Sequence, residues 1–109
     1  MTSVTSRVLI ARMEAAQRQN AQHLKMMYRQ IGLRAERLTI TEKAKSRSGR
    51  RTGSRWTRAD EQLYQHHVDR LTFERCGEIE ALSRKLKRQE TALDDARKRE
   101  SGNGGVVAR

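Results

Sequence analysis

The sequence predicts an all-α protein in which two long helices form an antiparallel, coiled-coil-like hairpin joined by a basic flexible loop. Three observations predict this fold. Proline is absent, so no residue type in the chain forces a helix to stop. Apolar residues recur at seven-residue spacing in two segments, which places them along one side of each helix. A glycine-, serine- and arginine-rich segment separates the two.

The first helix is expected over residues 1–42, with Ser3 or Thr5 able to cap its start. Gly32 lowers the helix propensity by about 1 kcal/mol. The stretch from Thr39 to Glu42 has the spacing of a capping box, so either the helix is expected to end there or a short second turn to restart. The apolar seam, meaning the line of side chains expected to face a partner helix, consists of Ile10, Met13, Leu24, Met27, Ile31 and Leu38.

The second helix is expected over residues 57–100. It starts near Thr57, whose hydroxyl comes three residues before Asp60 in a first turn that favours negative charge. The spacing of its apolar residues slips once near Arg75, which is a stutter in coiled-coil terms. A glycine-rich tail, residues 101–109, is expected to be flexible. The seam of this helix consists of Tyr64, Val68, Leu71, Ile79, Leu82, Leu86 and Leu93.

Both seams are thin. Apolar residues make up 35% of the 109 residues, against roughly 45–50% in an ordinary globular domain. Polar side chains at Gln17, Asn20 and Arg34 interrupt the first seam. A two-helix hairpin of this composition is marginal by itself. We therefore expect a further surface to complete it, either a second copy in a homodimer or a larger assembly.

The loop, residues 43–58, is the strongest functional signal. It holds seven basic and no acidic side chains in a chain whose formal net charge is +11. Guanidinium groups form paired hydrogen bonds with phosphate, and an aromatic ring can stack on an unpaired base. We expect nucleic acid as the partner, RNA rather than DNA. An acidic protein surface and a solvated linker remain open alternatives. The candidate contacts are Lys43, Lys45, Arg47, Arg50, Arg51, Arg55, Trp56 and Arg58.

Basic residues of the first helix also recur at helical spacing, among them Arg29, Arg34 and Arg37. They form either a solvated face or a continuation of the phosphate site. The one cysteine, Cys76, excludes an intrachain disulfide and fits an intracellular, reducing compartment. The cytoplasm is favoured, and the acid-poor, Arg/Ser/Thr-containing N-terminus leaves the mitochondrial matrix open. No apolar run is long enough for membrane insertion.

The sequence offers no catalytic, metal or cofactor site. The adjacent His66 and His67 point about 100° apart on a helix and cannot share a metal well. Together with His23 they are expected on the surface. Cys76 has no base placed by spacing to activate it. We therefore expect a protein that is not an enzyme and needs no cofactor.

Residues 7–16, Arg7-Val-Leu-Ile-Ala-Arg-Met-Glu-Ala-Ala16, precede a long helix that follows Trp56. This arrangement resembles the stalk proteins of flagellar and type III secretion export gates, which are antiparallel coiled-coil hairpins within the export ATPase ring. The resemblance implies a protein–protein role. This chain is shorter and its connection is more basic and richer in glycine and serine, so no functional residue is carried over.

Two functions follow from these patterns. The first is a non-enzymatic structural subunit that contacts the phosphates of nucleic acid through the basic loop, as in a ribonucleoprotein. The alternative is a coiled-coil adaptor or stalk, related to secretion export or the cytoskeleton, whose basic loop lies on an acidic protein. Binding that weakens steeply with salt would distinguish phosphate contact.

Overall fold

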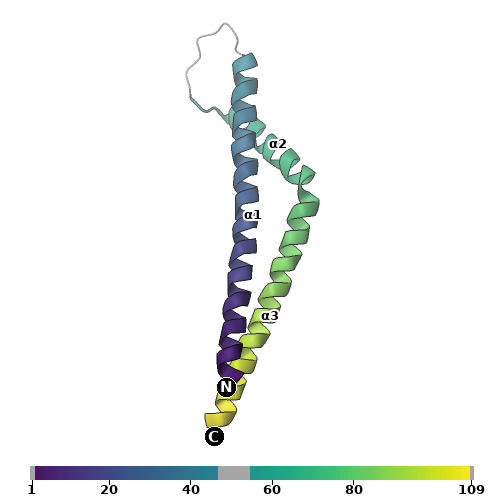
Figure 1. Cartoon of the computed structure of the whole chain (residues 1–109). Coiled ribbons are helices and arrows are strands. Elements are labelled where there is room, and N and C mark those ends of the chain that lie inside the picture. Colours follow the sequence, from purple (N-terminus) through teal and green to yellow (C-terminus); the bar gives the residue numbers. More distant parts are fainter. Residues whose placement is uncertain (1, 47–54, 109) are drawn as a thin grey trace. The chain divides into compact units, whose positions relative to one another are not determined.

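The computed structural model describes residues 2–46 and 55–108, and the side chains of residues 4–46 and 55–102. These residues form three helices, α1 (Thr2–Ser46), α2 (Arg58–Glu74) and α3 (Cys76–Ala108), and no strand (Figure 1). The all-α prediction is confirmed. The two-helix hairpin is not confirmed, because the expected second helix is divided into α2 and α3.

The first helix does not end at the stretch from Thr39 to Glu42. Thr39 is fully buried, and its Oγ1 donates a hydrogen bond of 2.8 Å to the carbonyl oxygen of Ala35. The hydroxyl is therefore satisfied inside the helix and does not cap a new one. Helix α1 continues to Ser46, so the expected loop start at Lys43 was wrong. Within the expected loop, only residues 55–57 are described as non-helical, and residues 47–54 lie outside the described part.

The start of α2 agrees with the sequence. Thr57 Oγ1 accepts a hydrogen bond of 3.1 Å from the backbone N–H of Asp60. The Asp60 carboxylate in turn accepts one of 2.8 Å from the backbone N–H of Thr57. This reciprocal capping box satisfies two backbone donors that the first turn would otherwise leave unpaired. Asp60 and Glu61 also place negative charge in the first turn, where the helix dipole favours it.

Helix α2 ends at Glu74, just before Arg75, where the seam spacing slips. Arg75 has φ −106° and ψ 12°, and its N–H donates to the carbonyl oxygens of Leu71 and Thr72, both at 3.2 Å. Leu71 and Ile79 are eight residues apart, so in one continuous helix they would point roughly 80° away from each other. Both are buried, one on each side of the break at Arg75. The prediction of one helix over residues 57–100 was therefore wrong, and the slip in apolar spacing near Arg75 marks where the helix is interrupted.

The chain forms two compact units. The central unit is residues 25–79, and the terminal unit is residues 1–24 with 80–109. In the central unit α1 and α2 run antiparallel: Glu42 lies 3.1 Å from His67, and Gln30 accepts a hydrogen bond of 3.3 Å from Arg75. The buried apolar side chains of this unit are Met27, Ile31, Ala35, Leu71 and Ile79.

In the terminal unit, the first part of α1 runs antiparallel to α3. Asn20 donates a hydrogen bond of 3.1 Å to Gln89, and Arg97 pairs with Glu14 at 2.6 Å. The Asn20–Gln89 pair lies at one of the polar interruptions of the seam, a position that fixes helix register in coiled coils. Leu93 and Ala96 are buried. Helix α3 extends to Ala108, so the expected end of the helix near Ser101 was wrong.

All thirteen seam residues are buried or half-buried. Met27, Ile31, Leu71, Ile79 and Leu93 are buried. The half-buried ones are Ile10, Met13, Leu24, Leu38, Tyr64, Val68, Leu82 and Leu86. The seven-residue pattern therefore identified the side of each helix that packs within the chain.

Gly32 lies where α2 approaches α1 closely. A Cβ atom at this position would lie 3.4 Å from the Tyr64 hydroxyl oxygen, which is an ordinary van der Waals separation. We predict that Gly32→Ala stabilises the protein by about 0.5–1 kcal/mol in urea unfolding, because alanine has the higher helix propensity. Gly32→Leu should destabilise it by about 1–3 kcal/mol, since the larger side chain displaces Tyr64.

Gly77→Ala is the matched control for this prediction, because a Cβ at Gly77 meets nothing within 4 Å and so reports helix propensity alone. A Gly32→Ala variant that is less stable than the parent protein would show that the approach of Tyr64 requires glycine.

Candidate nucleic-acid interface

Lys43 joins the two chain segments that flank residues 47–54. Its Nζ lies 2.7 Å from Asp60 Oδ2 and donates a second hydrogen bond of 2.6 Å to the carbonyl oxygen of Arg55. Only 14% of the Lys43 side chain is exposed. The ammonium group is therefore committed within the chain, and the contact of Lys43 with phosphate stays a prediction that this pairing disfavours. Spacing alone gave no sign that α1 would continue far enough to place Lys43 beside Asp60.

The environment of Asp60 keeps it ionised. Hydrogen bonds from Lys43 and from the backbone N–H of Thr57 lower the pKa of Asp60 from its ordinary value of 3.8 to about 2. The residue is 5% exposed. A buried carboxylate requires such partners. Asp60 is the first acidic residue after the basic segment, and its charge is already compensated by Lys43 and Thr57.

Trp56 and Glu61 form a second contact at the start of α2. The Trp56 Nε1 donates a hydrogen bond of 3.0 Å to Glu61 Oε1, and the indole meets the ring of Tyr64 edge to face at 6.2 Å between centroids. Hydrogen bonds from Gln65 and from Trp56 lower the pKa of Glu61. Trp56 remains 40% exposed, so part of its ring is open to a ligand while its N–H is used within the chain.

The remaining predicted cations differ from Lys43. Lys45, Arg55 and Arg58 are exposed, and none of them makes an ion pair with another described residue. Their positive charge is therefore available to an external anion. Arg47, Arg50 and Arg51 lie outside the described residues.

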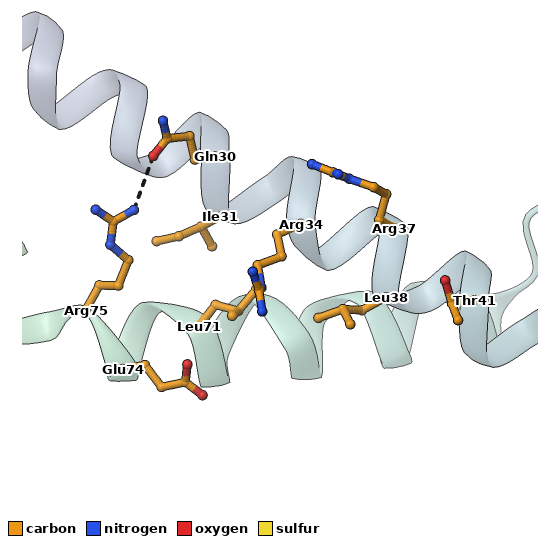
Figure 2. A pocket seen from close by; sticks show the side chains of 9 residues that line it. All are labelled: Gln30, Ile31, Arg34, Arg37, Leu38, Thr41, Leu71, Glu74 and Arg75. Atoms are coloured by element: carbon orange, nitrogen blue, oxygen red, sulfur yellow. Dashed lines mark hydrogen bonds between the residues drawn. The ribbon is translucent and has the colours of Figure 1, made fainter.

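A cavity of about 650 Å³ lies between α1 and α2 in the central unit, and the sequence gave no sign of it (Figure 2). Ile31, Leu38 and Leu71 supply its apolar lining. Arg34 extends from α1 toward Leu71 of α2, as Figure 2 shows. The other residues that line the cavity are Gln30, Arg37, Thr41, Glu74 and Arg75.

The three arginines that line this cavity differ in whether they form ion pairs and hydrogen bonds within the chain. Arg75 donates to Gln30 at 3.3 Å, shown by the dashed line in Figure 2, and lies 3.4 Å from Glu78. Arg34 and Arg37 make no ion pair with a described residue, since the Glu74 carboxylate pairs with Arg70 at 2.7 Å. An apolar surface beside unpaired guanidinium groups suits a ligand with both a flat apolar part and a negative charge. The sequence did not indicate the cavity, but the helical spacing of Arg34 and Arg37 did indicate a basic face on α1.

His67 is buried, which corrects the expectation that all three histidines lie on the surface. It is 5% exposed, and its Nε2 lies 3.1 Å from Glu42 Oε1 in a geometry that makes no hydrogen bond. His67 faces α1 because it lies four residues before the buried Leu71, on the same side of α2. Its role is therefore in the packing of α2 on α1.

Among the described residues, no group of three or more histidine, cysteine, aspartate or glutamate side chains is placed to hold a metal ion. In the same part of the chain, the helices contain no stretch that is both long and apolar enough to cross a bilayer.

Comparison with known proteins leaves the family of this chain open. No protein-family model matches it, and no curated protein or solved structure shows significant similarity. The resemblance to export-gate stalk proteins therefore stays a prediction.

The capping box at Thr57 gives a stability prediction. Thr57→Ala removes the oxygen that accepts from the Asp60 N–H, and we expect it to lower the free energy of unfolding by about 1 kcal/mol. Thr57→Ser keeps the oxygen and is the matched control, with an expected change of a few tenths of a kcal/mol at most. Urea unfolding followed by circular dichroism measures both. Equal midpoints for the alanine variant and the parent protein would contradict the role of this cap.

The lowered pKa of Asp60 gives a pH prediction. Because the folded state holds this proton less readily than the unfolded state, the stabilisation is complete above pH 3.8 and is lost as the pH falls toward about 2. Asp60→Asn should therefore have a lower Tm than the parent protein at neutral pH, and the difference should shrink over this range. Lys43→Met, which removes the main cause of the shift, should weaken the same pH dependence. A difference in Tm that stays constant down to pH 2 would contradict the assignment.

Proposed function

We propose that this protein is a non-enzymatic binding subunit that contacts the phosphates of nucleic acid, RNA in preference to DNA, through the basic end of its central unit. The contacts are Lys45, Arg55 and Arg58, together with Arg47, Arg50 and Arg51 of the connection. One observation carries the proposal: the carboxylates nearest to the exposed cations are already engaged with other partners.

The engagement of each carboxylate supports this reading. Asp60 pairs with Lys43 at 2.7 Å. Glu61 accepts hydrogen bonds from Trp56 and Gln65, at 3.0 and 3.1 Å. Glu42 lies beside His67. No acidic residue occurs from Lys43 to Ala59. The carboxylates nearest to the exposed cations along the chain thus have other partners, and the combined field of the cations favours a polyanion.

The choice of phosphate rests on the residue types. Five of the seven basic residues in this segment are arginines, whose planar groups form two parallel hydrogen bonds with phosphate oxygens. The preference for RNA rests on the cavity between α1 and α2. Its apolar lining beside Arg34 suits an unstacked base, and single-stranded RNA presents such bases more readily than a DNA duplex does.

The test is fluorescence anisotropy with a labelled single-stranded RNA of about 20 nucleotides over a series of salt concentrations. The triple variant Arg50→Gln, Arg51→Gln, Arg55→Gln should bind at least about tenfold more weakly and should show a shallower salt dependence, since each lost phosphate contact lowers the slope by about 0.7 for a single strand. The full-length protein is used throughout.

The charge-matched control removes three arginines of α3, with Arg84→Gln, Arg88→Gln and Arg99→Gln. These substitutions change the net charge equally and should weaken binding by less than about twofold if the contact is local. Equal losses in the two triple variants, or an affinity that does not change with salt, would contradict the proposal. Tighter binding to a DNA duplex than to the single-stranded RNA would contradict the preference for RNA.

A further inference from the structure

Helix α1 carries a second line of apolar side chains that does not pack within the central unit. Met26, Leu33 and Ile40 are 42%, 48% and 51% exposed. They are seven residues apart. At this spacing each side chain is rotated by only about 20° around the helix axis from the one before it, so the three lie nearly in line. We refer to these three residues as the outer stripe.

The outer stripe lies on the side of α1 away from α2. At about 100° per residue, its mean direction is roughly 160° from that of the buried Met27, Ile31 and Ala35. In this part of the chain α1 therefore has two apolar faces, one packed on α2 and one open. Seven-residue spacing over fourteen residues gives an apolar line about 21 Å long, with one apolar side chain in each heptad and charged or polar side chains between them.

We propose that the outer stripe is a docking site for an acidic amphipathic helix of another protein. The charges beside the stripe determine this choice. Arg29 lies between Met26 and Leu33, and Arg37 lies between Leu33 and Ile40. Both are exposed, and neither makes an ion pair with a described residue. Acidic side chains flanking the apolar seam of the incoming helix would pair with them.

A second copy of this chain fits the stripe poorly. Arg29 and Arg37 are each four residues from Leu33. An antiparallel copy centred on Leu33 would place Arg29 opposite Arg37, and a parallel copy would place each arginine beside its own counterpart. Both arrangements bring like charges together, at a cost to the interface.

One acidic residue, Glu36, also lies between Leu33 and Ile40. It lines a smaller cavity with Trp56, Glu61 and Tyr64, which places it toward the start of α2. The net charge of the side chains beside the outer stripe therefore remains positive. This proposal does not depend on nucleic-acid binding, because the apolar side chains of the outer stripe do not line the cavity between α1 and α2 and the ligand is an amphipathic peptide; Arg37 borders both surfaces.

The experiment uses three synthetic peptides of about 21 residues, the length of three heptads. The first has leucine at the seam positions and glutamate beside them. The second has lysine in place of glutamate, and the third is a scrambled form of the first with the same charge. Binding of each labelled peptide to the full-length protein is measured by fluorescence anisotropy. We expect the acidic amphipathic peptide to bind at least about tenfold more tightly than either control peptide.

The variants locate the site. Leu33→Ser should weaken binding of the acidic amphipathic peptide by at least about tenfold and leave RNA binding unchanged. The matched control is Phe73→Ser on α2, an apolar residue that is 76% exposed and lies off the stripe, and it should bind the peptide as the parent protein does. Arg29→Gln should weaken binding by a smaller factor and reduce its salt dependence.

Several results would overturn the proposal. If the scrambled acidic peptide binds as tightly as the amphipathic one, the contact is only the general attraction of a basic chain. If Leu33→Ser binds like the parent protein, the site lies elsewhere. Sedimentation velocity that shows a dimer dissolved by Leu33→Ser would assign the stripe to a second copy of this chain.

Discussion

The ion pair between Lys43 and Asp60 is the contact on which the arrangement of the central unit depends. Lys43 lies near the C-terminal end of α1, and Asp60 lies in the first turn of α2. Their 2.7 Å contact joins the two ends of the basic segment and orients the carboxylate that caps α2. One carboxylate thus serves a helix cap and an ion pair. Loss of either partner would leave the other charge buried without compensation.

A second constraint is the burial of one line of apolar side chains although the spacing of these residues along the sequence is irregular. Leu71 and Ile79 are eight residues apart, so in a continuous helix their side chains would point about 80° away from each other. Between them α2 ends at Glu74, Arg75 is its C-cap residue, and α3 begins at Cys76. The same break presents the Arg75 side chain to Gln30 and to the cavity between α1 and α2. A packing requirement therefore also shapes the candidate site.

The central unit offers two different surfaces. The basic end of the unit carries exposed cations without carboxylate partners in the described residues, which suits a polyanion. The outer stripe of α1 offers apolar side chains between arginines, which suits an acidic helix. A protein that uses both surfaces would link a nucleic acid to a protein partner. Such a role agrees with the thin seams, from which the sequence predicts a further surface that completes the fold.

The sequence by itself determined the helical class, the packed side of each helix and the start of α2. Seven-residue spacing and the Thr57–Asp60 capping box are local patterns, and a helix expresses them whatever surrounds it. The tertiary structure alone decided where α1 ends, that Lys43 pairs within the chain, that His67 is buried, and that an arginine-lined cavity exists. These depend on which residues of α2 face α1, and that pairing joins residues far apart in the sequence. Thr39 illustrates the difference: its spacing indicates a cap, whereas it is buried within α1 and its hydroxyl bonds to the carbonyl oxygen of Ala35.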